Sequence, residues 1–277
     1  MKPAAFDYLR ADSAADAAQR LRELGADARI LAGGQSLMAV LNMRLAQPAV
    51  LIDISRTPDL DYVRAGNGVL AIGAAATQGS VEWRAGLAAE VPLLAQAFPY
   101  ISHFQVRNRG TVCGSVAHAD PSAEIPLVLT VLDGTVVLRS AARQRTLSAA
   151  DFFQGMLTTA REPDELVEEV RFPLAQPGQR TAFTEFSARH GDFAIVSAAA
   201  VADARGLRLA IGGVADRPRV AHWPAGLAAG ELASAINDFA WELQAQDDGH
   251  ASAQFRRHLV RQLGAQVLRQ VTEETTT

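Results

Sequence analysis

Apolar residues recur along the chain at the spacing of helices in some segments and of strands in others. The segment "SAADAAQRLRELG", residues 13–25, has leucines along one edge. Ser13 with an acidic residue three positions later is a capping pattern, and Gly25 suits the position after a last helical turn. The segment is therefore predicted to be a helix. Helical spacing of apolar residues predicts two more helices, within residues 231–245 and 252–271, whose apolar stripes are typical of core packing.

Short apolar runs between these helices predict strands. "ARILAGG" and "AVLIDIS" are runs of strand length on either side of a short predicted helix, residues 36–47, which ends before Pro48. From residue 57 the pattern changes to short β segments separated by turns, with a hairpin signal at Asn67-Gly68. Two short helical stretches and the strands "TVVLRS" and "ELVEEVRFP" complete this region. We expect two subdomains, of about residues 1–56 and 57–175.

A turn-rich segment, residues 174–180, separates a third region. Beyond it the pattern predicts three antiparallel strands within residues 180–189 and 194–215, with a hairpin turn from Asp203 to Gly206. The two C-terminal helices follow. We therefore predict an α+β chain with a first domain over residues 1–175 and a smaller domain over residues 176–277.

Composition and charge exclude several classes of function. The chain has 277 residues, of which 49% are hydrophobic, so it has enough apolar material for more than one core. Its formal net charge of −4 leaves no basic excess to neutralise the phosphates of a nucleic acid. No apolar run approaches the roughly 20 residues that a membrane helix requires, and the first residues show no signal-peptide pattern. We expect a cytoplasmic protein without nucleic acid or membrane insertion.

Metal binding by this chain is not expected. Cys113 is the single cysteine, which excludes an internal disulfide and a cluster held by four thiolates of this chain. The six histidines are scattered and show no pairing of the HxxxH type.

The stretch "RILAGGQSLM", residues 29–38, places two adjacent glycines between two apolar runs. Gly34 can adopt a positive φ without a Cβ penalty, so the stretch is compatible with a tight turn. Consecutive backbone N–H groups can also line an anion site. The glycine pair by itself leaves both interpretations open.

A second loop of this kind lies in "HFQVRNRGTVCGSVAHADPSAEIP", residues 103–126. Small residues and hydroxyls, Gly110, Thr111, Gly114 and Ser115, stand nearly in a row. Small residues allow close approach of the backbone, and hydroxyls can bond phosphate oxygens without adding charge. Two such loops suit an elongated ligand with two phosphates, approached from both sides.

The two motifs together resemble the FAD-binding medium subunit of molybdenum hydroxylases, the family of xanthine dehydrogenase and carbon monoxide dehydrogenase. "PAVLIDIS", "IGAAAT", "FFQG", "EFSARHGDFAIVSAA" and "FRRHLV" fall in the family's order, so the resemblance covers nearly the whole chain. It implies a p-cresol methylhydroxylase-like FAD-binding domain of two subdomains, followed by a smaller domain with a three-stranded antiparallel sheet and helices.

The resemblance also implies noncovalent FAD, with backbone N–H groups of both loops around the pyrophosphate and acidic residues beside the AMP half. It implies neither a catalytic residue nor a metal ligand. The candidate cofactor-binding residues are Leu31, Ala32, Gly33, Gly34, Gln35, Ser36, Leu37, Gly110, Thr111, Val112, Cys113, Gly114, Ser115, Asp120, Glu124 and Phe193.

Two positions depart from the family pattern. Cys113 stands where the family usually has the first glycine of a TxGG turn. We expect this thiol to be inert because it would be buried under the pyrophosphate, whose negative charge raises a thiol pKa. Some relatives carry a lysine near the flavin where this chain has Thr184 and Glu185, so a cationic contact to the flavin is not expected.

The function implied by the resemblance is electron transfer within a multi-subunit enzyme. An iron–sulfur small subunit with [2Fe–2S] clusters would pass electrons from a molybdopterin-containing large subunit to FAD in this chain. This chain would deliver them to NAD+, oxygen or another acceptor, in a dimer of heterotrimers. One alternative is a self-contained flavin reductase of the same fold, similar to UDP-N-acetylenolpyruvoylglucosamine reductase. A second is a non-enzymatic binding module in which the glycine loops are only turns.

Overall fold

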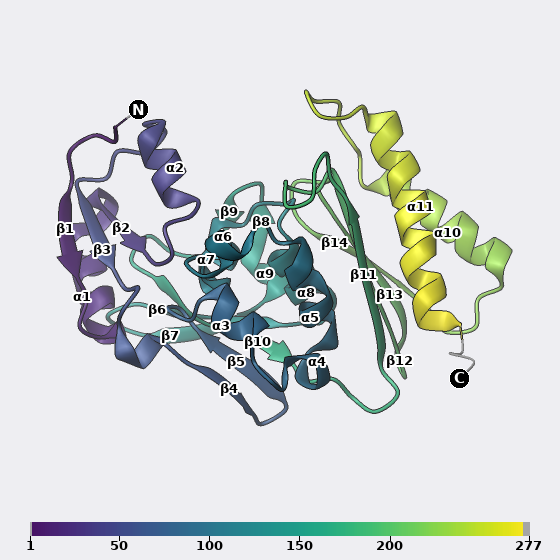
Figure 1. The fold of residues 1–277 in the computed structure, drawn as a ribbon, viewed down its shortest axis with the longest axis horizontal. Helices are drawn as coiled ribbons and strands as arrows, with labels where there is room; N and C mark the ends of the chain where they lie inside the picture. The colour runs from purple at the N-terminus through teal and green to yellow at the C-terminus, as the bar shows by residue number, and fades with distance from the viewer. Residues whose placement is uncertain (1, 274–277) are drawn as a thin grey trace.

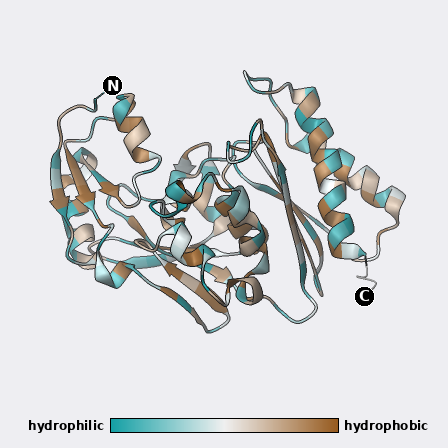
Figure 2. Ribbon diagram, viewed as in Figure 1, coloured by the Kyte–Doolittle hydropathy of each residue, from teal (hydrophilic) through white to brown (hydrophobic). Residues whose placement is uncertain are grey.

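The computed structural model of the chain describes residues 2–273. Three sheets follow one another across the molecule, from the parallel sheet at the N-terminal end to the sheet beneath the last two helices (Figure 1). Figure 2 shows hydrophobic residues concentrated in the strands, while α11 alternates hydrophobic and hydrophilic residues along its length. No helix within residues 2–273 combines the length and the apolar character needed to cross a membrane.

The first sheet is parallel, with the order β1-β3-β2, which are Asp7–Arg10, Val50–Asp53 and Ala28–Leu31. α1, Ala14–Leu24, confirms the helix predicted over residues 13–25. The Ser13 side chain accepts a hydrogen bond from the Asp16 N–H at 3.0 Å, and Gly25 ends the helix with a φ of 57°. β1 was not predicted from the sequence, because its residues are mostly exposed and carry no apolar alternation.

The second sheet is antiparallel, with the order β4-β5-β10-β6-β7. Asn67 and Gly68 both have positive φ at the turn between the first two strands, which confirms the predicted hairpin. In chain order, its elements are β4 (Val63–Gly66), β5 (Val69–Gly73), β6 (Thr135–Arg139), β7 (Gln144–Ser148) and β10 (Leu166–Pro173). A separate pair, β8 (Phe153–Gly155) and β9 (Thr158–Thr159), lies between β7 and β10 in the sequence.

Short helices surround this sheet and link it to the sheet that follows. They are α3 (Gln78–Glu82), α4 (Leu87–Glu90), α5 (Pro92–Ala97), α6 (Phe104–Arg107), α7 (Val112–His118), α8 (Glu124–Val131) and α9 (Ala149–Phe152). Another short helix, α2 (Leu37–Asn42), connects β2 and β3 of the first sheet. Single 3-10 turns lie at Gly25–Asp27, Pro58–Leu60 and Phe98–Tyr100. α2 is shorter than the helix predicted over residues 36–47, because the chain turns at Arg44, which has a φ of 56°.

The third sheet has four antiparallel strands, in the order β11-β12-β13-β14. The three predicted strands correspond to β11 (Arg180–Phe186), β12 (Val196–Asp203) and β13 (Gly206–Gly212). The prediction of three strands is therefore wrong by one, β14 (Arg219–Trp223). β14 is an edge strand whose residues are half-buried or exposed, so it lacks the apolar run that identifies its neighbours.

Both faces of the third sheet are covered, which explains the run of alanines in "SAAAVA". One face packs under α10 (Ala229–Glu242) and α11 (Ala253–Thr272). The other face packs against α8 and α5 and shares the main core. The predicted boundary at residues 174–180 lies between β10 and β11. The division into two domains at this point stays a prediction.

Arg208 of β13 joins the third sheet to the end of α8. Its side chain is almost fully buried, and it donates hydrogen bonds to the Val131 carbonyl at 2.7 Å, to Asp133 Oδ2 at 2.9 Å and to Asp203 Oδ2 at 2.6 Å. Arg205 contacts the same two carboxylates, at 3.0 and 3.4 Å, but its own side chain is 64% exposed.

Replacing Arg208 with methionine should destabilise the fold by about 3 kcal/mol, because it leaves the largely buried Asp203 carboxylate and the Val131 carbonyl without their main partner. Arg205→Met removes an exposed guanidinium from the same carboxylates and should cost less than about 1 kcal/mol. Urea unfolding of both variants measures the difference. Equal losses would show that burial of Arg208 is not what stabilises this contact.

Candidate functional site

The two glycine loops, far apart in the sequence, meet in the structure. The first, residues 32–36, connects β2 to α2, and the second, residues 109–111, connects α6 to α7. A Cβ built on Gly33 would collide with the Arg109 carbonyl oxygen and lie 2.6 Å from Gly110 Cα. A Cβ on Gly110 would in turn lie 3.4 Å from Gln35 Cγ. Gly33 is therefore required for close approach of the two backbones.

The first loop contains a real turn. Gly34 has a φ of 72°, and its carbonyl accepts a hydrogen bond from the Met38 N–H at 3.0 Å. Gln35 Nε2 donates to the Gly33 carbonyl at 3.2 Å. Ser36 begins α2 without capping it through its side chain. The turn interpretation is thus confirmed for Gly34, while the anion-site interpretation needs a ligand-directed test.

The second loop leads directly into α7. Thr111 Oγ1 caps this helix by accepting from the Gly114 N–H at 2.9 Å, and a Cβ on Gly114 would lie 2.7 Å from that oxygen. The first turn of any helix leaves N–H groups without helical partners. Thr111 satisfies one of them. Those of Val112 and Cys113 belong to the same turn and are the candidates for a ligand.

A third segment adjoins the second loop and was missed in the sequence. The Gln78 N–H donates to the Gly110 carbonyl at 2.7 Å, and Thr77 forms a β-bridge with Thr111. Gln78 is buried, and its Oε1 has no hydrogen-bond partner within residues 2–273. Because buried polar atoms normally have a partner, this oxygen is a candidate ligand contact. The "IGAAAT" motif ends at Thr77, directly before Gln78, but neither the motif nor Gln78 was among the predicted cofactor-binding residues.

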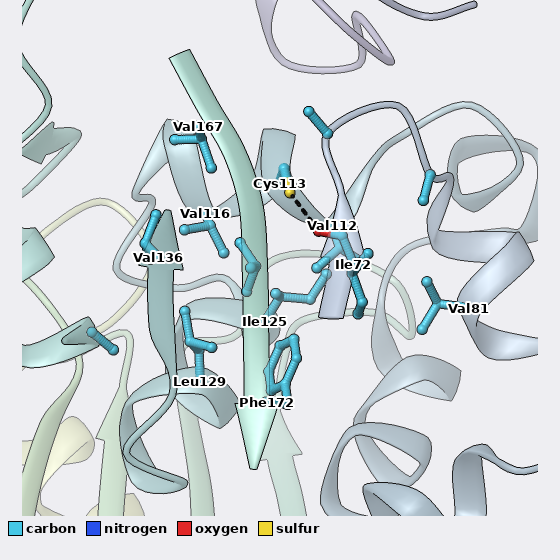
Figure 3. Close-up of a cluster of buried hydrophobic side chains, with 14 of the residues drawn as sticks. Ile72, Val81, Val112, Cys113, Val116, Ile125, Leu129, Val136, Val167 and Phe172 are labelled. Atoms are coloured by element: carbon cyan, nitrogen blue, oxygen red, sulfur yellow. Dashed lines mark hydrogen bonds between the residues drawn. The ribbon is translucent and has the colours of Figure 1, made fainter. Parts of the chain in front are cut away.

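The Cys113 side chain lies in the hydrophobic core, pointing away from the loops. Its Sγ donates to the Ile72 carbonyl at 3.3 Å, and Val112, Val116 and Phe172 lie in the same cluster (Figure 3). Burial, with a smaller contribution from the charge of Glu169, raises the pKa of the thiol far above its usual range. The expectation that the thiol lies under the pyrophosphate is therefore wrong. Helix α7 turns this position inward, and only its backbone remains at the loop.

Two of the predicted residues, Asp120 and Phe193, line a separate cleft of about 1060 Å³. The cleft lies between residues 120–122 and loops of the C-terminal region, including residues 213–216. Phe193 is 61% exposed, so it is not an ordinary core phenylalanine. The glycine-loop residues do not line this cleft. The structure thus brings the candidate residues together in two groups, one around the loops and one at the cleft.

Glu124, the first residue of α8, is buried and does not line the cleft. Burial raises its pKa to about 7, and the charge of Asp120 contributes. Burial likewise raises the pKa of Glu185 to about 8, with a contribution from the charge of Glu124.

The part of the chain that the structure describes contains no group of three or more His, Cys, Asp or Glu side chains placed to hold a metal ion. What it offers instead is glycine backbone, a capped helix start and an unpartnered amide oxygen around one contact. The N–H donors among them fit a neutral-lined phosphate site better than a metal centre, whereas the amide oxygen can only accept a hydrogen bond and would need a donor elsewhere on a ligand.

Comparison with known proteins agrees with this arrangement. A profile described as "FAD binding domain in molybdopterin dehydrogenase" matches residues 4–175, and one described as "CO dehydrogenase flavoprotein C-terminal domain" matches residues 181–271. The chain is 36% identical to the nicotine 6-hydroxylase medium subunit of Paenarthrobacter nicotinovorans, over 95% of this chain and 96% of that one. It is 41% identical to a 6-hydroxypseudooxynicotine dehydrogenase subunit from the same organism, over 73% and 68% of the two chains.

Solved structures show the same fold. Carbon monoxide dehydrogenase from Hydrogenophaga pseudoflava superposes with a TM-score of 0.93 at 29% identity, covering 98% of both chains. Quinoline 2-oxidoreductase from Pseudomonas putida 86 gives 0.91 at 33% identity, again over 98% of both. These matches confirm the α+β FAD-binding fold predicted from the two glycine motifs. The chain belongs to the family of FAD-binding medium subunits of molybdenum hydroxylases, and is an oxidoreductase subunit.

Proposed function

We propose that this chain transfers electrons through FAD from [2Fe–2S] clusters of an iron–sulfur small subunit to NAD+, oxygen or another acceptor. The observation that carries the proposal is the contact between the two glycine loops, which creates one backbone-lined surface in a chain of an FAD-binding family. FAD supplies the chemistry, because a flavin accepts electrons one at a time and can release them as a pair.

The residues of this chain would bind and position the cofactor. We propose that Ala32–Ser36 and Gly110–Ser115 hold its pyrophosphate through backbone N–H groups and hydroxyls, with Leu31 and Leu37 supporting the first loop. Cys113 would contribute its backbone only, since its side chain is in the core. Gln78 joins the candidates because its buried Oε1 lacks a partner in the described residues. Asp120 and Phe193, which line the cleft, and the buried Glu124 would contact other parts of FAD.

The assembly is part of the same proposal. The name of the nicotine 6-hydroxylase relative identifies it as a medium subunit. By analogy, we propose that this chain assembles with an iron–sulfur small subunit and a molybdopterin large subunit, as a dimer of heterotrimers in the cytoplasm. Residues 1–175 would bind FAD, and residues 176–277 would close the site and contact the partners.

The first test is of the cofactor and its attachment. The chain produced alone should copurify with flavin and reduce dyes with NADH, but it should not hydroxylate an organic substrate. Acid precipitation should release all the flavin, because the only cysteine is enclosed in the core. Flavin retained in the pellet would demonstrate a covalent bond. Substrate turnover by the single chain would favour the self-contained reductase.

The contact between the loops gives a second prediction. Gly33→Ala should force the backbones of Gly33 and Arg109 apart, because no flexible side chain is there to yield. Losing two charge-assisted hydrogen bonds to phosphate should cost about 3 kcal/mol, roughly a hundredfold in FAD affinity. Gly230→Ala is the matched control, because a Cβ there meets nothing within 4 Å.

Titration of the apoprotein with FAD, followed by flavin fluorescence, measures both affinities, and circular dichroism verifies folding. Gly34→Val should weaken binding as well, because a β-branched residue resists the φ of 72° at that position. Unchanged affinity in Gly33→Ala would show that the loops do not bind FAD.

A third prediction concerns Cys113. Iodoacetamide at neutral pH should leave the folded chain unmodified both with and without FAD, because the apolar core rather than the cofactor encloses the thiol. Modification after denaturation in urea is the control for reagent activity. Cys113→Ala should retain FAD at a cost of about 1 kcal/mol in stability. Rapid alkylation of the FAD-free chain alone would restore the interpretation that the cofactor covers the thiol.

A further inference from the structure

The short helices α3 and α6 are joined by a nearly buried ion pair. Arg107 donates from Nε to Glu82 Oε2 at 2.7 Å and from Nη2 to Glu82 Oε1 at 2.9 Å. The exposed fractions of the two side chains are only 11% and 13%. Gly79, one helical turn before Glu82, allows the two helices to approach, since a Cβ there would lie 2.5 Å from Asn108 Oδ1. The bidentate contact fixes the plane of the guanidinium.

The remaining nitrogen of this guanidinium binds the segment before α6. Arg107 Nη1 donates to the Ile101 carbonyl at 2.8 Å and to the Ser102 carbonyl at 3.3 Å. Ser102 has a φ of 42°, a conformation that residues other than glycine rarely adopt and that persists only where surrounding contacts enforce it. Arg107, oriented by Glu82, supplies such contacts. The ion pair therefore holds residues 101–102 in an unfavourable backbone conformation.

The segment held in this way supports the loop between β11 and β12. A Cβ built on Gly191 would lie 3.0 Å from His103 Cε1 and 3.1 Å from the Ser102 carbonyl oxygen, so only a residue without Cβ comes this close. The rings of His190 and Tyr100 add a second contact, with their centroids 6.4 Å apart. The middle of the β11–β12 loop thus rests on residues of the FAD-binding part of the chain.

The same loop carries Phe193 to the cleft. Phe193 lines the cleft and is 61% exposed. Residues 188–190 are exposed as well, whereas Gly191 is half-buried. Within the loop, the Asp192 N–H donates to the Arg189 carbonyl at 3.0 Å and forms a tight turn around Gly191. The contact at Gly191 therefore supports the loop two residues before Phe193.

We propose that Arg107 is a positioning residue for Phe193. It holds residues 101–102 in the conformation against which the β11–β12 loop packs, and this packing sets where the ring of Phe193 lies. The other end of α6 leads into the second glycine loop, since the Val106 carbonyl accepts from the Gly110 N–H at 2.7 Å. One four-residue helix thus holds both groups of candidate residues. What Phe193 does toward FAD rests on the proposed function, but its positioning does not require the cofactor.

Spin labelling of the FAD-free chain measures the mobility of the loop. Phe193→Cys in a Cys113→Ala background provides a single thiol for a nitroxide label. Arg107→Met should shorten the rotational correlation time of this label roughly twofold, because the loop loses its support. Glu82→Gln keeps the side-chain volume but removes the charge of the pair, and should act in the same direction. Circular dichroism verifies that each variant is folded.

Two controls separate positioning from a general loosening of the fold. Arg84→Met breaks a similar bidentate pair, that of Arg84 with Glu90 at 2.6 and 2.8 Å. The remaining nitrogen of Arg84 donates to the Val63 carbonyl of β4, so the loop label should be unchanged. A label at Glu23→Cys, an exposed position of α1, should not respond to Arg107→Met.

Gly191→Ala tests the same contact from the side of the loop. The added Cβ would meet His103 and the Ser102 carbonyl, so the loop must move and the label should again become more mobile. Gly178→Ala, in the turn between β10 and β11, is the matched control. Gly178 has a φ of 77°, close to the 86° of Gly191, but a Cβ there meets nothing within 4 Å.

The double variant of Arg107→Met and Gly191→Ala should change the label little more than either single variant, because both break one contact. Fully additive effects would overturn the proposal, as would unchanged mobility in Arg107→Met. Equal mobility in Gly191→Ala and Gly178→Ala would overturn it too, and this comparison decides alone where Arg107→Met does not fold. Failure of the chain to bind FAD would contradict the proposed function without affecting the label results.

Discussion

The close approach of Gly33 to the Arg109–Gly110 backbone is the constraint on which the candidate site depends. It allows two loops from different parts of the chain to share one surface, and only a residue without Cβ permits it. Each loop is followed by a helix, so the first-turn N–H groups of α2 and α7 are carried to the same region. The site is therefore made of backbone, and its donors are positioned by packing rather than by charged side chains.

α8 connects this site to the rest of the molecule. Its first residue is the buried Glu124, and its last carbonyl, that of Val131, accepts a hydrogen bond from Arg208 of the C-terminal sheet. Between these ends its apolar residues share a core with α5, α7 and the sheet. A polar contact therefore holds the C-terminal end of α8, and apolar packing holds the rest of the helix.

The core position of Cys113 shows how a site residue can be assigned to the wrong surroundings. Its place in the motif is beside the cofactor loop, and its backbone is there. The helix that begins at Val112 rotates the thiol towards β5, where it occupies a space lined by aliphatic side chains. Glu124 and Phe193 were both predicted from the resemblance to bind the cofactor. Their surroundings differ, since Glu124 is buried and Phe193 is 61% exposed.

The sequence by itself determined the elements whose signals are local: the Ser13 and Gly25 caps of α1, the Asn67-Gly68 hairpin, the strands with long apolar runs and the two glycine motifs that identify the family. It did not identify β1 and β14, whose exposed residues pair only because a neighbouring strand is already in place. Nor did it select Gln78, or show that Glu185 and Ser197 are paired across β11 and β12. Those relations join residues that are distant in sequence. They are decided by sheet register and helix packing, which no local pattern encodes.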